Sequence, residues 1–85
     1  MPLVTGKVVD GQGRPVAGAR VFFSSGPGAY ADVALLTGDD GEYTIAAPAE
    51  GEYEITTVAD EHGSATTKVK VPGNGVNELE LRVRP

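Results

Sequence analysis

The sequence of 85 residues has no cysteine, no tryptophan and a single histidine. Without cysteine the chain has neither a disulfide framework nor a thiolate metal site. Basic residues are also scarce: 7 Lys and Arg stand against 12 Asp and Glu, for a net charge of −5. This balance argues against nucleic acid as a partner, because binding phosphates requires a basic surface.

Long hydrophobic runs are missing as well. The longest wholly apolar runs are a few residues, as in Val33-Ala34-Leu35-Leu36, so we expect no membrane span. Met1-Pro2-Leu3 does not open a signal peptide, since the basic and apolar regions are absent. The length fits one small domain, and we expect residues 1–85 to form a single domain excised from a larger protein.

The chain does have 12 glycines and 6 prolines, which occur at nearly regular intervals and leave little room for a helix. Between them lie short runs rich in Val, Thr, Ile, Tyr and Phe, most of which alternate with period two. A helix across 29–36 is the alternative, but it is too short to be stable alone. The pattern predicts an all-β, antiparallel sandwich or barrel. Its seven expected strands are 3–10, 19–25, 33–37, 42–47, 52–60, 64–71 and 77–83.

Alternation also assigns the faces of these strands, because successive side chains point to opposite sides. Phe22 is expected to point outward, and Val58 breaks the alternation of its strand, for which a β-bulge is one explanation. The side chains expected in the core include Ala19, Val21, Phe23, Tyr43, Ile45, Tyr53, Ile55, Leu79, Leu81 and Val83.

A series of short motifs runs through the chain. It begins with Gly6-x-Val8-x-Asp10 and Gly13-x-Pro15-Val16-x-Gly18-Ala19-x-Val21. It continues, in order, with Thr37, Asp40-Gly41, Tyr43-x-Ile45, Gly51-x-Tyr53-x-Ile55 and Val69-x-Val71. Together these motifs resemble those of carboxypeptidase regulatory-like domains. These elements are structural, so they specify a scaffold rather than a chemistry.

The resemblance implies a seven-stranded sandwich of transthyretin-like (prealbumin-like) or immunoglobulin-like Greek-key connectivity, and leaves open which of the two. It also implies a non-catalytic accessory module of a larger secreted or cell-envelope protein. Such a module spaces or docks a neighbouring domain of the same polypeptide, or another protein. On this basis we expect an extracellular or envelope setting, no catalytic residues and no required cofactor.

Enzymatic alternatives find little support. His62 lies in a Glu-His-Gly turn, and Ser64 would leave the same face of an extended strand, but no orienting group or oxyanion site is signalled. A hydrolase subfamily of transthyretin-like sandwiches carries several histidines and ends in Tyr-Arg-Gly-Ser. This chain ends in Leu81-Arg82-Val83-Arg84-Pro85 instead.

A second relative is the collagen-adhesin B-type domain, in which a lysine and an asparagine form an isopeptide promoted by a buried glutamic acid. Lys7 and Asn77 lie in roughly suitable strands, but the place of the glutamic acid is taken by Thr57. Without that acid the amide lacks a proton shuttle, and alternation places Lys7 outward. We therefore expect no isopeptide.

Charge gives a weaker functional signal. From Val21 to Thr67 there are nine acidic residues and no Lys or Arg. A solvated surface is the simplest interpretation. The alternative is a Ca²⁺ site where Asp39 and Asp40 converge with Glu42 or Glu50, since calcium takes several carboxylate oxygens.

Carbohydrate binding is the other alternative, because starch-binding sandwiches stack sugars on exposed aromatic rings. With Tyr43 and Tyr53 expected in the core, Tyr30 and Phe22 are the remaining candidates. Tyr30 lies in the loop 24–32, the longest expected connection and the segment best suited to recognition.

Overall fold

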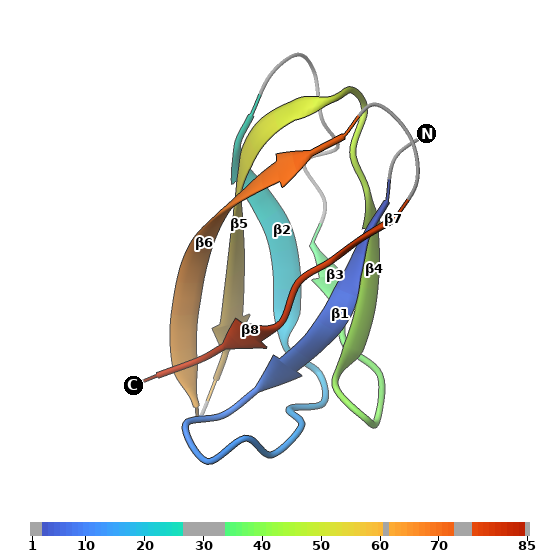
Figure 1. The fold of residues 1–85 in the computed structure, drawn as a ribbon. Coiled ribbons are helices and arrows are strands. Elements are labelled where there is room, and N and C mark those ends of the chain that lie inside the picture. The colour runs from blue at the N-terminus through green and yellow to red at the C-terminus, as the bar shows by residue number, and fades with distance from the viewer. Residues whose placement is uncertain (1–2, 27–33, 61, 73–75, 85) are drawn as a thin grey trace.

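The computed structural model describes residues 3–26, 34–60, 62–72 and 76–84. Two β-sheets face each other across one core (Figure 1). The strands are β1 (Leu3–Val9), β2 (Arg20–Ser25), β3 (Leu35–Leu36), β4 (Glu42–Ala46), β5 (Gly51–Ala59), β6 (Gly63–Val71), β7 (Val76–Glu78) and β8 (Leu81–Arg82). The described residues form no helix, and accordingly none that is long and apolar enough to cross a membrane.

One sheet has the order β4-β1-β7, with β8 also paired to β1, and the other has the order β3-β2-β5-β6. Both β7 and β8 pair with β1 and are separated only by residues 79–80, so together they correspond to the last of the seven predicted strands. The predicted all-β sandwich is confirmed. The strands begin and end within about two residues of the predicted bounds, except that the last predicted strand is interrupted at residues 79–80.

The pairing of β1 with β7 and β8 is parallel, whereas the other strand pairs among the described residues are antiparallel. Leu3 lies opposite Val76, and Val9 lies opposite Arg82. The chain therefore enters the sandwich at the start of β1 and leaves it beyond β8 at the other end of the same sheet (Figure 1).

The core contains the side chains that the alternation predicts. Tyr43 and Tyr53 are only 4% and 1% exposed, and Leu81 and Val83 are fully buried. Leu79 is the exception, since it is only partly buried and packs against the edge of the core. The two tyrosines are therefore interior residues, and each hydroxyl bonds to a backbone carbonyl.

The prediction of a β-bulge at Val58 is wrong. The β5–β6 register is regular from Gly51 to Ala59, and the burial of β5 alternates without a break. Thr57 is the inward residue and is fully buried, whereas Val58 is half-buried on the outer face. A threonine side chain has nearly the shape of a valine side chain, so Thr57 fits this core position although it is polar. The register shifts instead in β2, between Phe23 and Ser25.

Two buried polar residues hold the connection between β1 and β2. The Asp10 carboxylate accepts hydrogen bonds from the backbone N–H groups of Gln12 and Arg14 and from the Arg14 guanidinium, at 2.9–3.0 Å. The backbone hydrogen bond from Arg14 is the main cause that lowers the pKa of Asp10. The Thr37 hydroxyl donates to the Val16 carbonyl and accepts from the Ala19 amide. Both residues thus belong to the scaffold.

Candidate functional site

Of the two residues predicted to bind sugar, Phe22 is among the described residues and Tyr30 is not. Tyr30 and most of the loop 24–32 lie outside the described residues. Phe22 is half-buried on the outer face of β2, opposite Thr56 of β5. Beside it the Thr56 hydroxyl donates to Ser24 at 2.8 Å and bonds with the Thr66 hydroxyl at 3.0 Å. Carbohydrate binding stays a prediction.

The carboxylate turn, formed by Asp39, Asp40 and Glu42, brings two of its carboxyls together. A hydrogen bond between the side chains of Asp40 and Glu42 lowers the pKa of Asp40 and raises that of Glu42. The Asp40 carboxylate also accepts from the Glu42 amide at 3.3 Å. Within the described part of the chain, no group of three or more His, Cys, Asp or Glu side chains is placed to hold a metal ion. The calcium site stays a prediction.

The remaining candidates for chemistry are either exposed or, in one case, part of the core. His62 is exposed in the turn after β5, where it lines a small hollow with Asp60. Ser64 is exposed on β6, and its backbone pairs with that of Arg84. Lys7 is exposed on the outer face of β1, as predicted, whereas Thr57 lies in the core on the opposite sheet.

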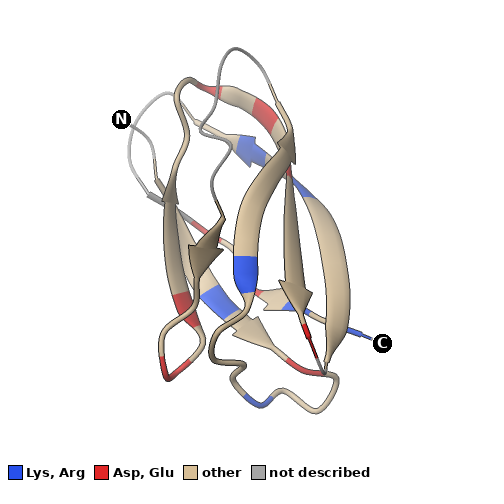
Figure 2. Ribbon diagram, turned by 180° about the vertical axis from the view of Figure 1, so that it is seen from behind, with Lys and Arg blue, Asp and Glu red and all other residues tan. Residues whose placement is uncertain are grey.

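The acidic middle of the sequence is opposed by basic residues in space. In the β5–β6 pair, Glu52 lies opposite Lys70 and Glu54 lies opposite Lys68. Arg20 at the start of β2 forms an ion pair with Asp60 at 3.0 Å. Figure 2, seen from behind, shows both basic and acidic segments distributed over the strands. The uneven charge along the sequence therefore does not become a single acidic surface here.

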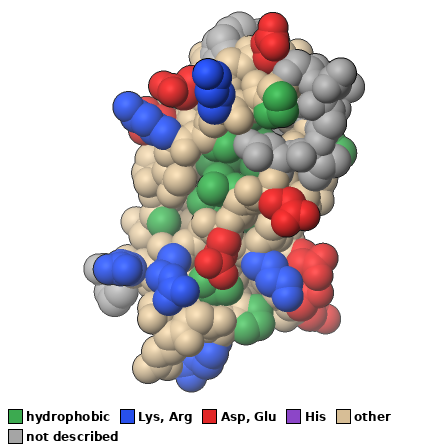
Figure 3. Space-filling model, in the orientation of Figure 1, with side chains coloured by type: hydrophobic (Ala, Val, Ile, Leu, Met, Phe, Trp, Pro, Cys, Tyr) green, Lys and Arg blue, Asp and Glu red, His purple; other side chains and the backbone are tan. Residues whose placement is uncertain are grey.

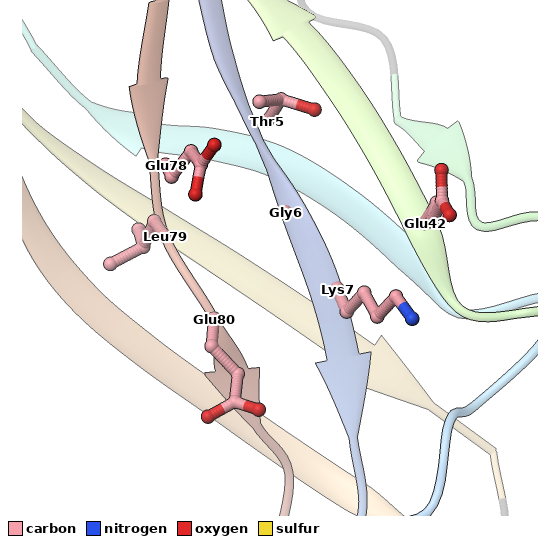
Figure 4. Close-up of a pocket in the computed structure, with 7 residues that line it drawn as sticks. All are labelled: Thr5, Gly6, Lys7, Glu42, Glu78, Leu79 and Glu80. Carbon is pink, nitrogen blue, oxygen red and sulfur yellow. The ribbon is translucent and has the colours of Figure 1, made fainter.

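A hollow of about 510 Å³ lies where the segment from β7 to β8 runs beside β1. Figure 4 shows the lining side chains, with those of Lys7 and Glu42 on the β4 side and that of Glu80 on the β8 side. The residues that line it are Thr5, Gly6, Lys7, Glu42, Glu78, Leu79 and Glu80. On this face of the molecule, acidic and basic side chains surround apolar surface (Figure 3).

At this hollow Gly6 allows the last strand to approach β1 closely. A Cβ on Gly6 would lie 1.9 Å from the carbonyl oxygen of Leu79 and 2.7 Å from its carbonyl carbon. Contacts that short with backbone cannot be relieved by rotating a side chain, so any larger residue at position 6 would push β1 and the last strand apart. The Leu79 amide remains in the ladder and donates to the Thr5 carbonyl at 2.8 Å.

Tyr43 completes this contact from the third strand of the sheet. It lies opposite Gly6 in the β1–β4 register, and its hydroxyl donates to the Leu79 carbonyl at 2.5 Å. Because Gly6 has no side chain, the phenol passes β1 at this point and reaches the strand beyond it. Burial raises the pKa of Tyr43 to about 12, so the hydroxyl keeps its proton at neutral pH. We call Gly6, Tyr43 and Leu79 the tyrosine lock.

The lock also explains the interruption between β7 and β8. The Leu79 carbonyl accepts a hydrogen bond from the Tyr43 hydroxyl. This bond takes the place of a backbone hydrogen bond to β1, and the strand is interrupted there. The sequence analysis missed this arrangement, although a glycine inside a strand is a recognised sign of close backbone approach. Nothing in the sequence identifies Leu79 as its partner.

Tyr53 is used differently. Its hydroxyl donates to the Ala49 carbonyl at 2.8 Å and accepts from the Ala49 amide at 3.2 Å, four residues back along the chain. Its ring packs on Phe23, with centroids 4.6 Å apart. Tyrosines in corners of Greek-key sandwiches make the same kind of local bond. Tyr53 therefore fixes a corner, and Tyr43 joins three strands.

Comparison with known proteins agrees with this scaffold. A comparison with curated proteins gave no match for this chain. The family model described as "Carboxypeptidase regulatory-like domain" matches residues 3–84, which include the eight strands of the described residues and the tyrosine lock. The chain therefore belongs to the carboxypeptidase regulatory-like domain family.

Proposed function

We propose that this chain is a non-catalytic accessory module that holds its neighbours in a larger polypeptide apart. The observation that carries the proposal is the parallel pairing of β1 with β7 and β8. It places the start of β1 and the end of β8 at opposite ends of the sheet. Six residue steps from Leu3 to Val9 already span about 20 Å along the strand.

The buried tyrosines support a scaffold rather than a reaction centre. Tyr43 and Tyr53, two of the chain's three tyrosines, are core residues whose hydroxyls bond to backbone carbonyls. The hollow beside β1 is lined by residues of the paired strands and of the segment between β7 and β8. Membership of a regulatory-like family agrees with an accessory role.

We place this module in a secreted or cell-envelope protein, with neighbouring segments of the same polypeptide as its partners. The setting rests on the family, whose members are typically found in extracellular or surface proteins. The sandwich itself is 33 Å long and 20 by 18 Å across, so its long axis is well suited to separating two neighbours.

Small-angle X-ray scattering of one, two and three copies fused head to tail tests the spacing role. Each added copy is expected to increase the maximum dimension by close to the long axis of 33 Å. Arrays in which the copies fold back on one another, with growth nearer the 18–20 Å width, would contradict it. Short and long linkers between copies are compared, so that a linker effect is recognised.

A further inference from the structure

We propose that this module also bears tension, through a mechanical clamp made by β1, β7 and β8 together with the tyrosine lock. This inference rests on the spacing role, because a module that separates two neighbours transmits any force between them. The fold resists this force at the clamp.

The clamp follows from the direction of the strands. Tension applied at the two chain ends pulls β1 one way and β8 the other, along axes that lie side by side in parallel. The bonds between them then carry the load together and must break together. In a pair whose neighbouring ends are pulled apart, the bonds break one after another at lower force.

Several bonds span this boundary. The Leu79 amide donates to the Thr5 carbonyl at 2.8 Å, and the Val83 amide donates to the Val9 carbonyl at 2.9 Å. Parallel ladder pairing covers both the start of β1, through β7, and its end, through β8. Between the two ladders, the Tyr43 hydroxyl donates a hydrogen bond to the Leu79 carbonyl.

The lock strengthens the clamp because it joins strands that are not neighbours. Tyr43 is on β4, and Leu79 lies on the far side of β1. Sliding of the last strand along β1 therefore also breaks a bond to β4. Leu81 and Val83 are fully buried, so sliding must also draw them out of the core. Slow unfolding under load, rather than high equilibrium stability, is the property that this arrangement favours.

Single-molecule force spectroscopy in two pulling directions tests the clamp. The chain has no cysteine, so an introduced cysteine defines a second attachment point without interference. One molecule is pulled by its two ends. The other, Glu78→Cys, is pulled between its N-terminal end and position 78, which lies opposite Thr5 near the start of β1. We expect end-to-end pulling to require the higher unfolding force.

Two tyrosine variants separate the clamp from general stability. Tyr43→Phe removes the lock's hydroxyl, and Tyr53→Phe removes a hydroxyl whose bond to Ala49 is local. Both are expected to lower the urea midpoint by similar amounts. At a fixed end-to-end force, Tyr43→Phe should unfold about tenfold faster than the unmodified chain, and Tyr53→Phe within about twofold of it.

Equal unfolding forces in the two directions would overturn the clamp, as would equal acceleration by the two variants. The folded length before rupture is read in the same traces. A long folded extension with a low rupture force leaves the spacing role standing and removes the clamp. A short extension contradicts the spacing role itself.

Discussion

Replacing Gly6 with alanine puts a methyl group where the Leu79 carbonyl lies. The new Cβ would be 1.9 Å from that oxygen and 3.2 Å from the Leu79 amide nitrogen. All of the nearest atoms are backbone, so relief requires the last strand to move away from β1. That movement also draws the Leu79 carbonyl away from the Tyr43 hydroxyl, which it meets at 2.5 Å.

The two effects set the size of the change. Forcing an extra carbon into a packed interior costs about 1–3 kcal/mol. Leaving the Tyr43 hydroxyl and the carbonyl of the partly buried Leu79 without each other costs about 1–3 kcal/mol more. We therefore expect Gly6→Ala to lower the free energy of unfolding by about 2–6 kcal/mol. This is a large share of the total stability, which at about 0.05–0.15 kcal/mol per residue is about 4–13 kcal/mol for 85 residues.

Urea unfolding measures this change, followed by far-UV circular dichroism or tyrosine fluorescence. Gly11→Ala is the matched control, because a Cβ there meets nothing within 4 Å. Neither glycine has a positive φ. The control should be unchanged or up to about 1 kcal/mol more stable, since alanine restricts the unfolded chain. If Gly6→Ala unfolds at the same urea concentration as Gly11→Ala, the close approach of Leu79 is not a feature of the folded protein.

Four other predictions concern polar groups. Thr57→Val should raise the free energy of unfolding by about 1 kcal/mol, because the buried Thr57 hydroxyl has no hydrogen-bond partner among the described residues. Thr37→Val should lower it by about 1–3 kcal/mol, because that hydroxyl bonds to two backbone groups; equal effects in urea melts would contradict this reasoning. The pKa of Tyr43 is raised from 10.0 to about 12, so its contribution to stability is complete below pH 10 and is lost as the pH rises toward 12. Tyr43→Phe should remove that part of the alkaline loss, and an unchanged pH profile would argue against a buried phenol. If the carboxylate turn binds calcium, millimolar calcium should raise the melting temperature, and Asp40→Asn should abolish this rise. An unchanged melting temperature in calcium would contradict the predicted site.

Local pattern was enough to predict the strands and most of the core. The turns at glycine and proline, and the alternation within each run, depend on neighbours in the sequence. Tyr43 and Tyr53 are buried as their alternation predicts. Val58 shows the limit of this reasoning, because its hydrophobicity suggested a break in the alternation, whereas β5 alternates without a break and Thr57 is the buried residue.

The tyrosine lock could not be predicted in the same way. It joins residues 6, 43 and 79, whose meeting depends on which strands are neighbours and in which direction they run. Parallel pairing of the first and last strands is a property of the whole chain, and no short segment encodes it. The charge pattern has the same limit: Glu52 and Glu54 belong to an acidic stretch, but β6 places lysines opposite them.

The distance between the two ends of the chain tests the spacing role most directly. Nitroxide labels on cysteines that replace Leu3 and Arg84 report it by double electron–electron resonance, with Leu3 and Ala46, which are paired neighbours, as the short control. Parallel strands predict a Cα separation of about 25 Å between positions 3 and 84, from eight residue steps along the strand direction. A separation as short as that of the control pair would mean that both ends leave the sandwich together, and the module could not hold its neighbours apart.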